Sequence, residues 1–297
     1  MVLITGAPGA DGYDKTFREL GEAWEKLASS NQFNFTWLGH GSTNTTNDLH
    51  LFESLLASEP REGNHEFWLI LIGHGTFNGR EAKFNLRGPD LEAKHFVTLL
   101  NGFKRPTILI NAFSASGAFL KPLSRQGRVI VTATRAGSQI NYSRFGEQFT
   151  EMIGSSESDL DKDGQTSLLE AFISSARRVA DFYKSNGRLA TEHALLDDNG
   201  DGLGTPVDFF QGVRPTKKPS GNELPDGLRA HQLHLLPSLE EQQLTPDQRV
   251  RRNELELQIA ALREQKSKFQ QEEYFLQLEK LLLDLARLYQ TNSSAVK

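Results

Sequence analysis

Cysteine is absent from the 297 residues of this chain. Disulfide bridges and thiolate metal sites are therefore excluded, and so is a cysteine nucleophile. Also lacking is any apolar run of the roughly 18–20 residues that a membrane-spanning helix needs. The first residues, MVLITGAPGA, are too short and too uncharged for a signal peptide. The sequence leaves the compartment open, and export would require a longer precursor that carries a signal.

A strong excess of charge is lacking as well. The net charge is −5 and the pI is near 5.9, so we expect no basic surface for nucleic acid or for an anionic membrane. Hydrophobic residues make up 37% of the chain and charged residues 24%, which is typical of a globular protein. This length suffices for one large α/β domain with appended pieces, or for two ordinary domains.

The first two hundred residues alternate short apolar runs with amphipathic stretches, which is typical of βαβ units on a mainly parallel sheet. Strands are expected at 1–6, 33–38, 67–72, 107–110 and 128–134. Helices are expected at 14–29, 47–56, 90–100 and 145–153, with a polar hairpin over 77–86. Functional sites of open α/β sheets lie beyond the carboxyl ends of the strands. His74 and Ser114 follow two neighbouring strands and are therefore candidate functional residues.

Two sequence motifs surround these candidates. LILIGHGTFNG (69–79) places His74 and Gly75 directly after one buried strand, and TILINAFSASGAF (107–119) places Ser114 after the next. Together the motifs resemble the signature strands of the caspase/legumain group of cysteine peptidases, most closely the legumain family. In that group one strand ends in His-Gly, and the next ends in Cys-x-Ser-Gly. The resemblance covers about residues 1–155 and implies a caspase-like α/β fold.

By this resemblance, His74 holds the position of the catalytic histidine, and Gly75 that of the residue whose backbone N–H helps to form the oxyanion hole. Ser114 holds the nucleophile position when the alignment is anchored on the following Ser-Gly pair. When it is anchored on the preceding Asn-Ala pair, Phe113 takes that position instead. A serine hydroxyl is far less acidic than a thiol and needs a positioned base. We therefore expect slow or absent turnover.

The resemblance also implies a substrate-facing segment further along the chain. VIVTATRAGSQINYSRF (129–145) occupies the place where the next strand of the family lines the substrate cleft. Thr134, Arg135 and Ser138 are thus candidates to face a peptide or protein substrate. The alternative is an ordinary exit from a strand into a loop, with a surface arginine.

A calcium-binding loop is predicted at DLDKDGQTSLLE (159–170), which fits the EF-hand template, with glycine at the sixth position for the sharp turn. Its candidate ligands are Asp159, Asp161, Asp163, the carbonyl of Gln165, Ser167 and Glu170. Four carboxylates this close would repel one another without a cation, so Ca²⁺ is the expected cofactor. A helix should follow over 168–186. The alternative is an acidic capped loop without a metal.

A second stretch, DDNGDGLGTPVD (197–208), repeats the first half of this template. Its candidate ligands are Asp197, Asn199, Asp201 and Asp208, with Thr205 at the ninth position. Asp208 replaces the usual glutamate at the twelfth position and reaches less well for bidentate binding. This stretch is either a second calcium site or an acidic loop without a metal.

Domain boundaries follow from composition. Residues 1–211 are expected to form the caspase/legumain-like α/β domain, which includes the 159–170 loop. Residues 212–244 contain four prolines and are expected to form a linker or strap. Residues 245–291 are predicted to form a helical hairpin or coiled coil, because Thr245 and Pro246 give a strong helix start. The apolar spacing weakens over 264–268, so a break between two antiparallel helices is expected near 269–272.

Three functions are consistent with these features. The first is a peptidase-fold protein of the caspase/legumain type, either a natural pseudoenzyme or a cysteine endopeptidase inactivated by a Cys-to-Ser change. The second is a non-catalytic, calcium-stabilised scaffold that associates with itself or with a protein partner through residues 245–291. The third is a serine hydrolase that uses His74 and Ser114.

Overall fold

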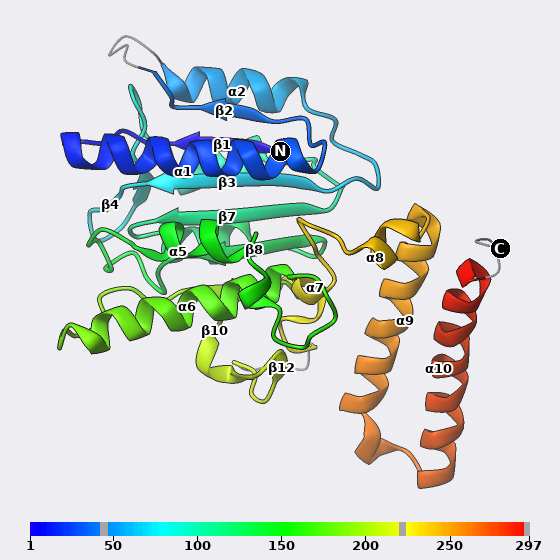
Figure 1. Cartoon of the computed structure of the whole chain (residues 1–297). Helices are drawn as coiled ribbons and strands as arrows, with labels where there is room; N and C mark the ends of the chain where they lie inside the picture. Colours follow the sequence, from blue (N-terminus) through cyan, green and yellow to red (C-terminus); the bar gives the residue numbers. More distant parts are fainter. Residues whose placement is uncertain (42–46, 220–223, 294–297) are drawn as a thin grey trace.

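A seven-stranded sheet lies at the centre of the computed structural model, which describes residues 1–41, 47–219 and 224–293 (Figure 1). The strand order is β10-β9-β8-β7-β3-β1-β2. The parallel strands are β1 (Val2–Thr5), β2 (Thr36–Leu38), β3 (Phe67–Gly73), β7 (Thr107–Phe113) and β8 (Arg128–Thr132). Antiparallel pairing adds β9 (Leu195–Asp197) and β10 (Thr205–Pro206). The predicted α/β class with a mainly parallel sheet is confirmed.

The central strands β3 and β7 are buried along their whole length. Both read as nearly continuous apolar runs rather than as alternating patterns, because helices cover the two faces of the sheet. They pair in parallel, with Gly73 in register with Phe113. The residues that follow each strand therefore leave the sheet side by side at its carboxyl edge.

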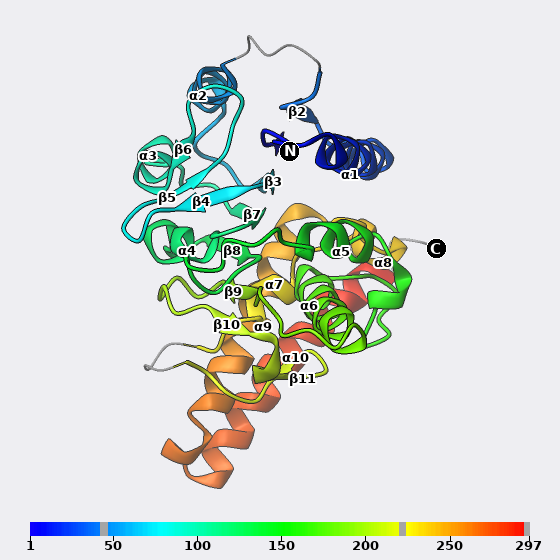
Figure 2. The same cartoon turned by 90° about the vertical axis from the view of Figure 1, so that its left-hand side faces the viewer.

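Two groups of helices cover the two faces of the sheet (Figure 2). One face carries α1 (Asp11–Ser30), α5 (Phe145–Met152) and α6 (Leu168–Ser185). The other face carries α2 (Asp48–Ser58), α3 (Ala93–Leu99) and α4 (Gly117–Leu123). Ile70 and Ile72 of β3 belong to the core under the first group, and Leu69 and Leu71 to the core under the second. Each face of the sheet thus has its own apolar core.

Short elements depart from the sequence prediction. The stretch predicted as a polar hairpin belongs to a small antiparallel sheet of β4 (Gly75–Phe77), β5 (Ala82–Phe84) and β6 (Leu91–Glu92). Because β6 pairs with β5, the following helix α3 begins at Ala93 rather than near 90. Strands β9 and β10 were not predicted, since two or three residues are too few to establish a period.

The proline-rich strap, residues 212–244, contains short regular elements instead of a bare linker. Two short 3-10 turns come earlier in the chain: η1 (Ser156–Ser158) lies before α6, and η2 (Val207–Phe209) lies just before the strap. The hairpin of β11 (Phe210–Gln211) and β12 (Arg214–Pro215) spans the expected boundary at 211. Two short helices follow, α7 (Leu228–His231) and α8 (Leu239–Gln243).

Two antiparallel helices end the described chain, α9 (Pro246–Glu264) and α10 (Gln271–Ser293), separated by η3 (Lys266–Lys268). The helix start predicted at Thr245 and Pro246 is confirmed, and Thr245 and Gln248 form a capping box there. A buried ion pair between Arg252 and Glu241 joins α9 to α8. The helix pair stands beside the sheet, with α10 on the far side of α9 (Figure 1). Within the described ranges, no helix is both long and apolar enough to cross a bilayer.

Candidate active site and acidic loops

His74 and Ser114 lie at the carboxyl ends of the adjacent strands β3 and β7. The His74 ring contacts Tyr13 and Phe17 of α1, at centroid distances of 4.5 Å and 5.4 Å. Phe113 points to the opposite face, where its ring lies 4.7 Å from that of Phe84. Phe113 is therefore a core residue. Ser114 is the first residue of the turn after β7, as His74 is the first residue after β3.

The imidazole of His74 is oriented by a backbone carbonyl. Its Nε2 lies 3.2 Å from the carbonyl oxygen of Pro8, in the loop between β1 and α1. A carbonyl oxygen only accepts hydrogen bonds, so Nε2 carries the proton and Nδ1 is left as the basic nitrogen. Burial lowers the pKa of the half-buried His74, which keeps the ring neutral near pH 7. The sequence does not identify Pro8 as the partner, because a backbone carbonyl leaves no residue signature.

Ser114 is buried, with 1% of its surface exposed, and its Oγ has no hydrogen-bond partner in the described part of the chain. The next residue, Ala115, has a φ of +62°, a left-handed conformation that is uncommon for a residue with a Cβ. Its N–H donates to the carbonyl of Gln139 at 2.8 Å. Ser114 thus sits at a sharp turn between β7 and α4, with a hydroxyl that neither His74 nor any other described residue engages.

The backbone of Gly75 packs directly on the carbonyl of Ser114. A Cβ on Gly75 would stand 2.0 Å from the Ser114 carbonyl oxygen and 2.8 Å from the Phe113 ring. Contacts under 3.0 Å with backbone atoms require the chain to move. Only glycine therefore allows the turn after His74 to lie against the turn at Ser114.

The three residues expected to face a substrate have different environments. Thr134 is wholly buried, contrary to expectation, and cannot face a ligand. Its backbone N–H donates to Ser116 Oγ at 3.2 Å, and its own Oγ1 accepts from the Gly117 N–H at 2.9 Å. It therefore clamps the turn that follows Ser114. Arg135 and Ser138 are exposed and remain available to a ligand.

A polar network behind this turn was not found by sequence reasoning. Gln139 Nε2 lies 2.6 Å from Nδ1 of His193, whose pKa is lowered by burial and by the nearby Arg135. The buried Glu192 accepts hydrogen bonds from Ser143 Oγ at 2.6 Å and from the backbone N–H groups of 144 and 145. These contacts join the segment before β9 to the start of α5. Their sequence separation gives no periodic signal that could have revealed them.

The 159–170 loop is held by a ladder of carboxylate-to-backbone hydrogen bonds. Asp159 Oδ2 accepts from the Gly164 N–H at 3.2 Å, and Asp161 Oδ1 from the Asp163 N–H at 3.2 Å. Asp163 Oδ1 in turn accepts from the Gln165 N–H at 3.1 Å. Oxygens of the three aspartates lie within 4.8 Å of one another. Three predicted ligands are therefore brought together around one point.

Glu170 closes the same loop from the first turn of α6. Its Oε1 accepts from the backbone N–H groups of Leu160 at 2.7 Å and Asp161 at 3.2 Å. Its Oε2 accepts from the N–H and Oγ of Ser167, each at 2.8 Å. On the solvent side, His231 Nε2 lies 3.0 Å from Asp161 Oδ2. A cation in this loop would compete with His231 for that oxygen.

The 197–208 loop repeats this ladder bond for bond. Asp197 Oδ2 accepts from the Gly202 N–H at 3.1 Å, and Asn199 Oδ1 from the Asp201 N–H at 2.8 Å. Asp201 Oδ1 accepts from the Leu203 N–H at 2.7 Å. The first, third and fifth positions of the two loops thus have the same geometry, although their sequences match only in part.

Asp226 of the strap, rather than Asp208, takes the place that Glu170 has in the first loop. Its Oδ1 accepts from the N–H groups of Asp198 at 2.9 Å and Asn199 at 3.2 Å, and its Oδ2 from Thr205 Oγ1 at 2.6 Å. Asp208 is exposed in η2. Burial raises the pKa of both Asp226 and Asp198, and their mutual repulsion adds to the rise for Asp226. Asp226 lies outside the twelve-residue template, which is why the sequence motif did not include it.

No protein-family model matches the chain, and no curated protein matches it. Among solved structures, a crystal structure of the Drosophila initiator caspase Dronc aligns with a TM-score of 0.42 and 16% sequence identity. The alignment covers 66% of this chain and 78% of that chain. A similarity at this level leaves the family of the chain open.

Proposed function

We propose that this chain is a peptidase-fold protein of the caspase/legumain type in which Ser114 replaces the nucleophilic cysteine, and that it has little or no peptidase activity. The observation that carries the proposal is that His74 and Ser114 directly follow the adjacent parallel strands β3 and β7, with His74 oriented by Pro8. Arg135 and Ser138 would face a peptide or protein ligand, and the backbone of Gly75 would lie beside its scissile carbonyl.

Low activity is supported by the state of the hydroxyl. Ser114 Oγ is buried and has no hydrogen-bond partner among the described residues, whereas an active serine needs a base in hydrogen-bond contact with its proton. A cysteine at the same position would be partly ionised without such contact, and a nearby imidazole would need only to favour the thiolate. The arrangement thus suits a thiol better than the hydroxyl that the chain has, which favours a pseudoenzyme over a serine hydrolase.

The test is to restore the thiol. In Ser114→Cys, we expect the thiolate absorbance near 240 nm to appear at lower pH than in the double variant Ser114→Cys/His74→Ala, because the imidazole stabilises the thiolate. Ser138→Cys, on the exposed part of the neighbouring loop, supplies an ordinary surface thiol for comparison. A mixed peptide library should be cleaved by Ser114→Cys but not by the parent. Identical thiol titrations with and without His74 would contradict the dyad.

A second proposal is that the chain binds calcium at both acidic loops. It is supported by the hydrogen-bond ladder that the two loops share and, in the first loop, by the oxygens of Asp159, Asp161 and Asp163, which lie within 4.8 Å of one another. Hard oxygen donors suit Ca²⁺, and a cation would offset the repulsion among the clustered carboxylates. In the first loop the ligands would be Asp159, Asp161, Asp163, the Gln165 carbonyl and Glu170, with Ser167 supporting Glu170.

In the second loop the ligands would be Asp197, Asn199, Asp201 and Asp226. Because Asp226 belongs to the strap, the second ion would fasten residues 212–244 to the end of β9. The first ion would hold the 159–170 loop against the start of α6. Calcium would thereby stabilise the region that links the α/β domain to α9 and α10, a structural role that is compatible with a pseudoenzyme.

A further inference from the structure

Helix α10 carries two apolar stripes, of which only one is covered by the part of the chain that the structure describes. Tyr274, at 5% exposure, begins the stripe that packs on α9, and Leu278, Leu281, Leu285 and Leu288 continue it, all partly buried. The second stripe, here called the outer α10 patch, consists of Phe275, Leu276, Leu282 and Leu283. These side chains are 49%, 67%, 44% and 47% exposed, respectively. Large exposed apolar side chains that recur on one helix face mark an interaction surface.

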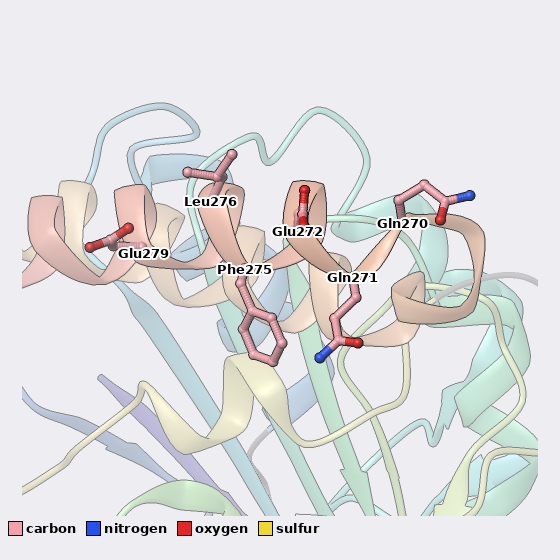
Figure 3. A pocket seen from close by; sticks show the side chains of 6 residues that line it. All are labelled: Gln270, Gln271, Glu272, Phe275, Leu276 and Glu279. Carbon is pink, nitrogen blue, oxygen red and sulfur yellow. The ribbon is translucent and has the colours of Figure 1, made fainter.

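Shallow grooves run along this patch. One, of about 920 Å³, is lined by Gln270, Gln271, Glu272, Phe275, Leu276 and Glu279 (Figure 3). A second, of about 390 Å³, is lined by Phe275, Leu278, Glu279, Leu282 and Leu283. Figure 3 shows Phe275 and Leu276 projecting toward the two edges of the helix face that also carries Glu272 and Glu279. The surface is thus an open trough with apolar walls, a shape that accepts the ridge of another helix.

Two acidic side chains lie within the trough. Glu272 and Glu279 are one heptad apart, both are exposed, and neither forms an ion pair with any described residue. Their spacing matches that of Leu276 and Leu283, which are also one heptad apart. A partner that buries the apolar walls must bring cations close to both carboxylates, since an unpaired charge in a covered interface is costly.

We propose that the outer α10 patch binds an amphipathic helix of another protein, one with leucine-type side chains at heptad spacing flanked by lysine or arginine. The apolar ridge would fill the trough, and the basic residues would pair with Glu272 and Glu279. A second copy of this chain is the alternative occupant, and it would bring the glutamates of two patches into one interface. The proposal is independent of the peptidase-like site.

The test uses the full chain and two synthetic peptides of about three heptads each. Both have leucine at the a and d positions; the e and g positions hold lysine in one peptide and glutamate in the other. By fluorescence anisotropy, we expect the lysine peptide to bind with an affinity that falls as salt is raised. The glutamate peptide should not bind. Equal binding of the two peptides, or binding of neither, would overturn the proposal.

Substitutions then locate the site. Leu283→Gln and Glu279→Lys should each weaken binding of the lysine peptide about tenfold, the usual scale for a central contact. Gln277→Lys, exposed on the same helix but outside the patch, adds the same charge and should change affinity far less than Glu279→Lys. Circular dichroism would verify that α10 stays folded in each variant. If light scattering instead finds a dimer that Leu283→Gln converts to a monomer, the patch belongs to a second copy and the proposal fails.

Discussion

Gly75 and Ser114 touch through their backbones: a Cβ on Gly75 would stand 2.0 Å from the carbonyl oxygen of Ser114. That oxygen belongs to the turn that joins β7 to α4, so it cannot move without shifting the turn. We predict that Gly75→Ala lowers the free energy of unfolding by about 1–3 kcal/mol, the usual scale for overpacking, as measured by urea denaturation. Gly12→Ala is the matched control, because a Cβ there meets no atom within 4 Å, and it should be neutral or slightly stabilising.

Calcium should raise the melting temperature of the parent protein, because a ligand that binds only the folded state stabilises that state by mass action. In the double variant Asp161→Ala/Glu170→Gln, we predict that the part of this shift due to the first loop is lost. Differential scanning calorimetry with calcium, with magnesium and with a chelator would measure it. A variant whose melting temperature rises with calcium as much as that of the parent would exclude the 159–170 loop as a site.

The second loop allows a direct comparison of two aspartates. Asp226→Asn should reduce calcium binding at this loop, because Asp226 closes it, whereas Asp208→Asn should leave binding unchanged, because Asp208 is exposed in η2. Isothermal titration of calcium into each variant gives the number of sites and their affinities. If Asp208→Asn reduced calcium binding more than Asp226→Asn did, Asp208 would be the residue that closes the loop.

His234 provides a pH-dependent contribution to stability. Burial lowers its pKa to about 4, against opposing contributions from Glu241 and Asp163. The unfolded chain, with an ordinary histidine pKa near 6.5, binds more protons between these values. The free energy of unfolding should therefore fall as the pH drops from about 6.5 to about 4, by up to about 3 kcal/mol.

His234→Gln should flatten this part of the stability profile relative to the parent. Arg252 and His231 also face His234 and disfavour its charged form, but both remain in the variant, so the difference between the two profiles isolates His234. Denaturant unfolding at several pH values between 4 and 7 measures it. Parallel profiles would show that His234 titrates normally in the folded protein.

Much of the fold could be predicted from sequence because its central strands are long and apolar. The runs FWLILIG and TILINAF stand out against their polar surroundings, and the helix starts at Ser167 and Thr245 carry capping boxes that require specific residue types. The antiparallel strands β9 and β10 were missed because they have only three and two residues. Their place in the sheet depends on backbone pairing with β8, which is far away in the sequence. The short helices of the strap were missed because four or five residues are too few to establish a helical period.

The candidate site was predictable only where side-chain identity carries the chemistry. The residues His74 and Ser114 and the aspartates of the first loop could be named because imidazole, hydroxyl and carboxylate groups stood at motif spacing. Pro8 could not, since it acts through its carbonyl oxygen, and neither could Asp226, since tertiary folding alone brings it to the second loop. Thr134 was assigned to the surface because burial is not encoded in a single polar residue.

The two edge strands of the central sheet, β10 and β2, are short. At one edge, β10 has two residues, and its second is Pro206, which has no backbone N–H to donate. At the other edge, β2 has three residues. Neither edge offers a row of free amide and carbonyl groups on which a strand from a neighbouring molecule could be templated. The sheet is therefore poorly suited to grow by edge-to-edge addition, the route by which exposed strands start to aggregate.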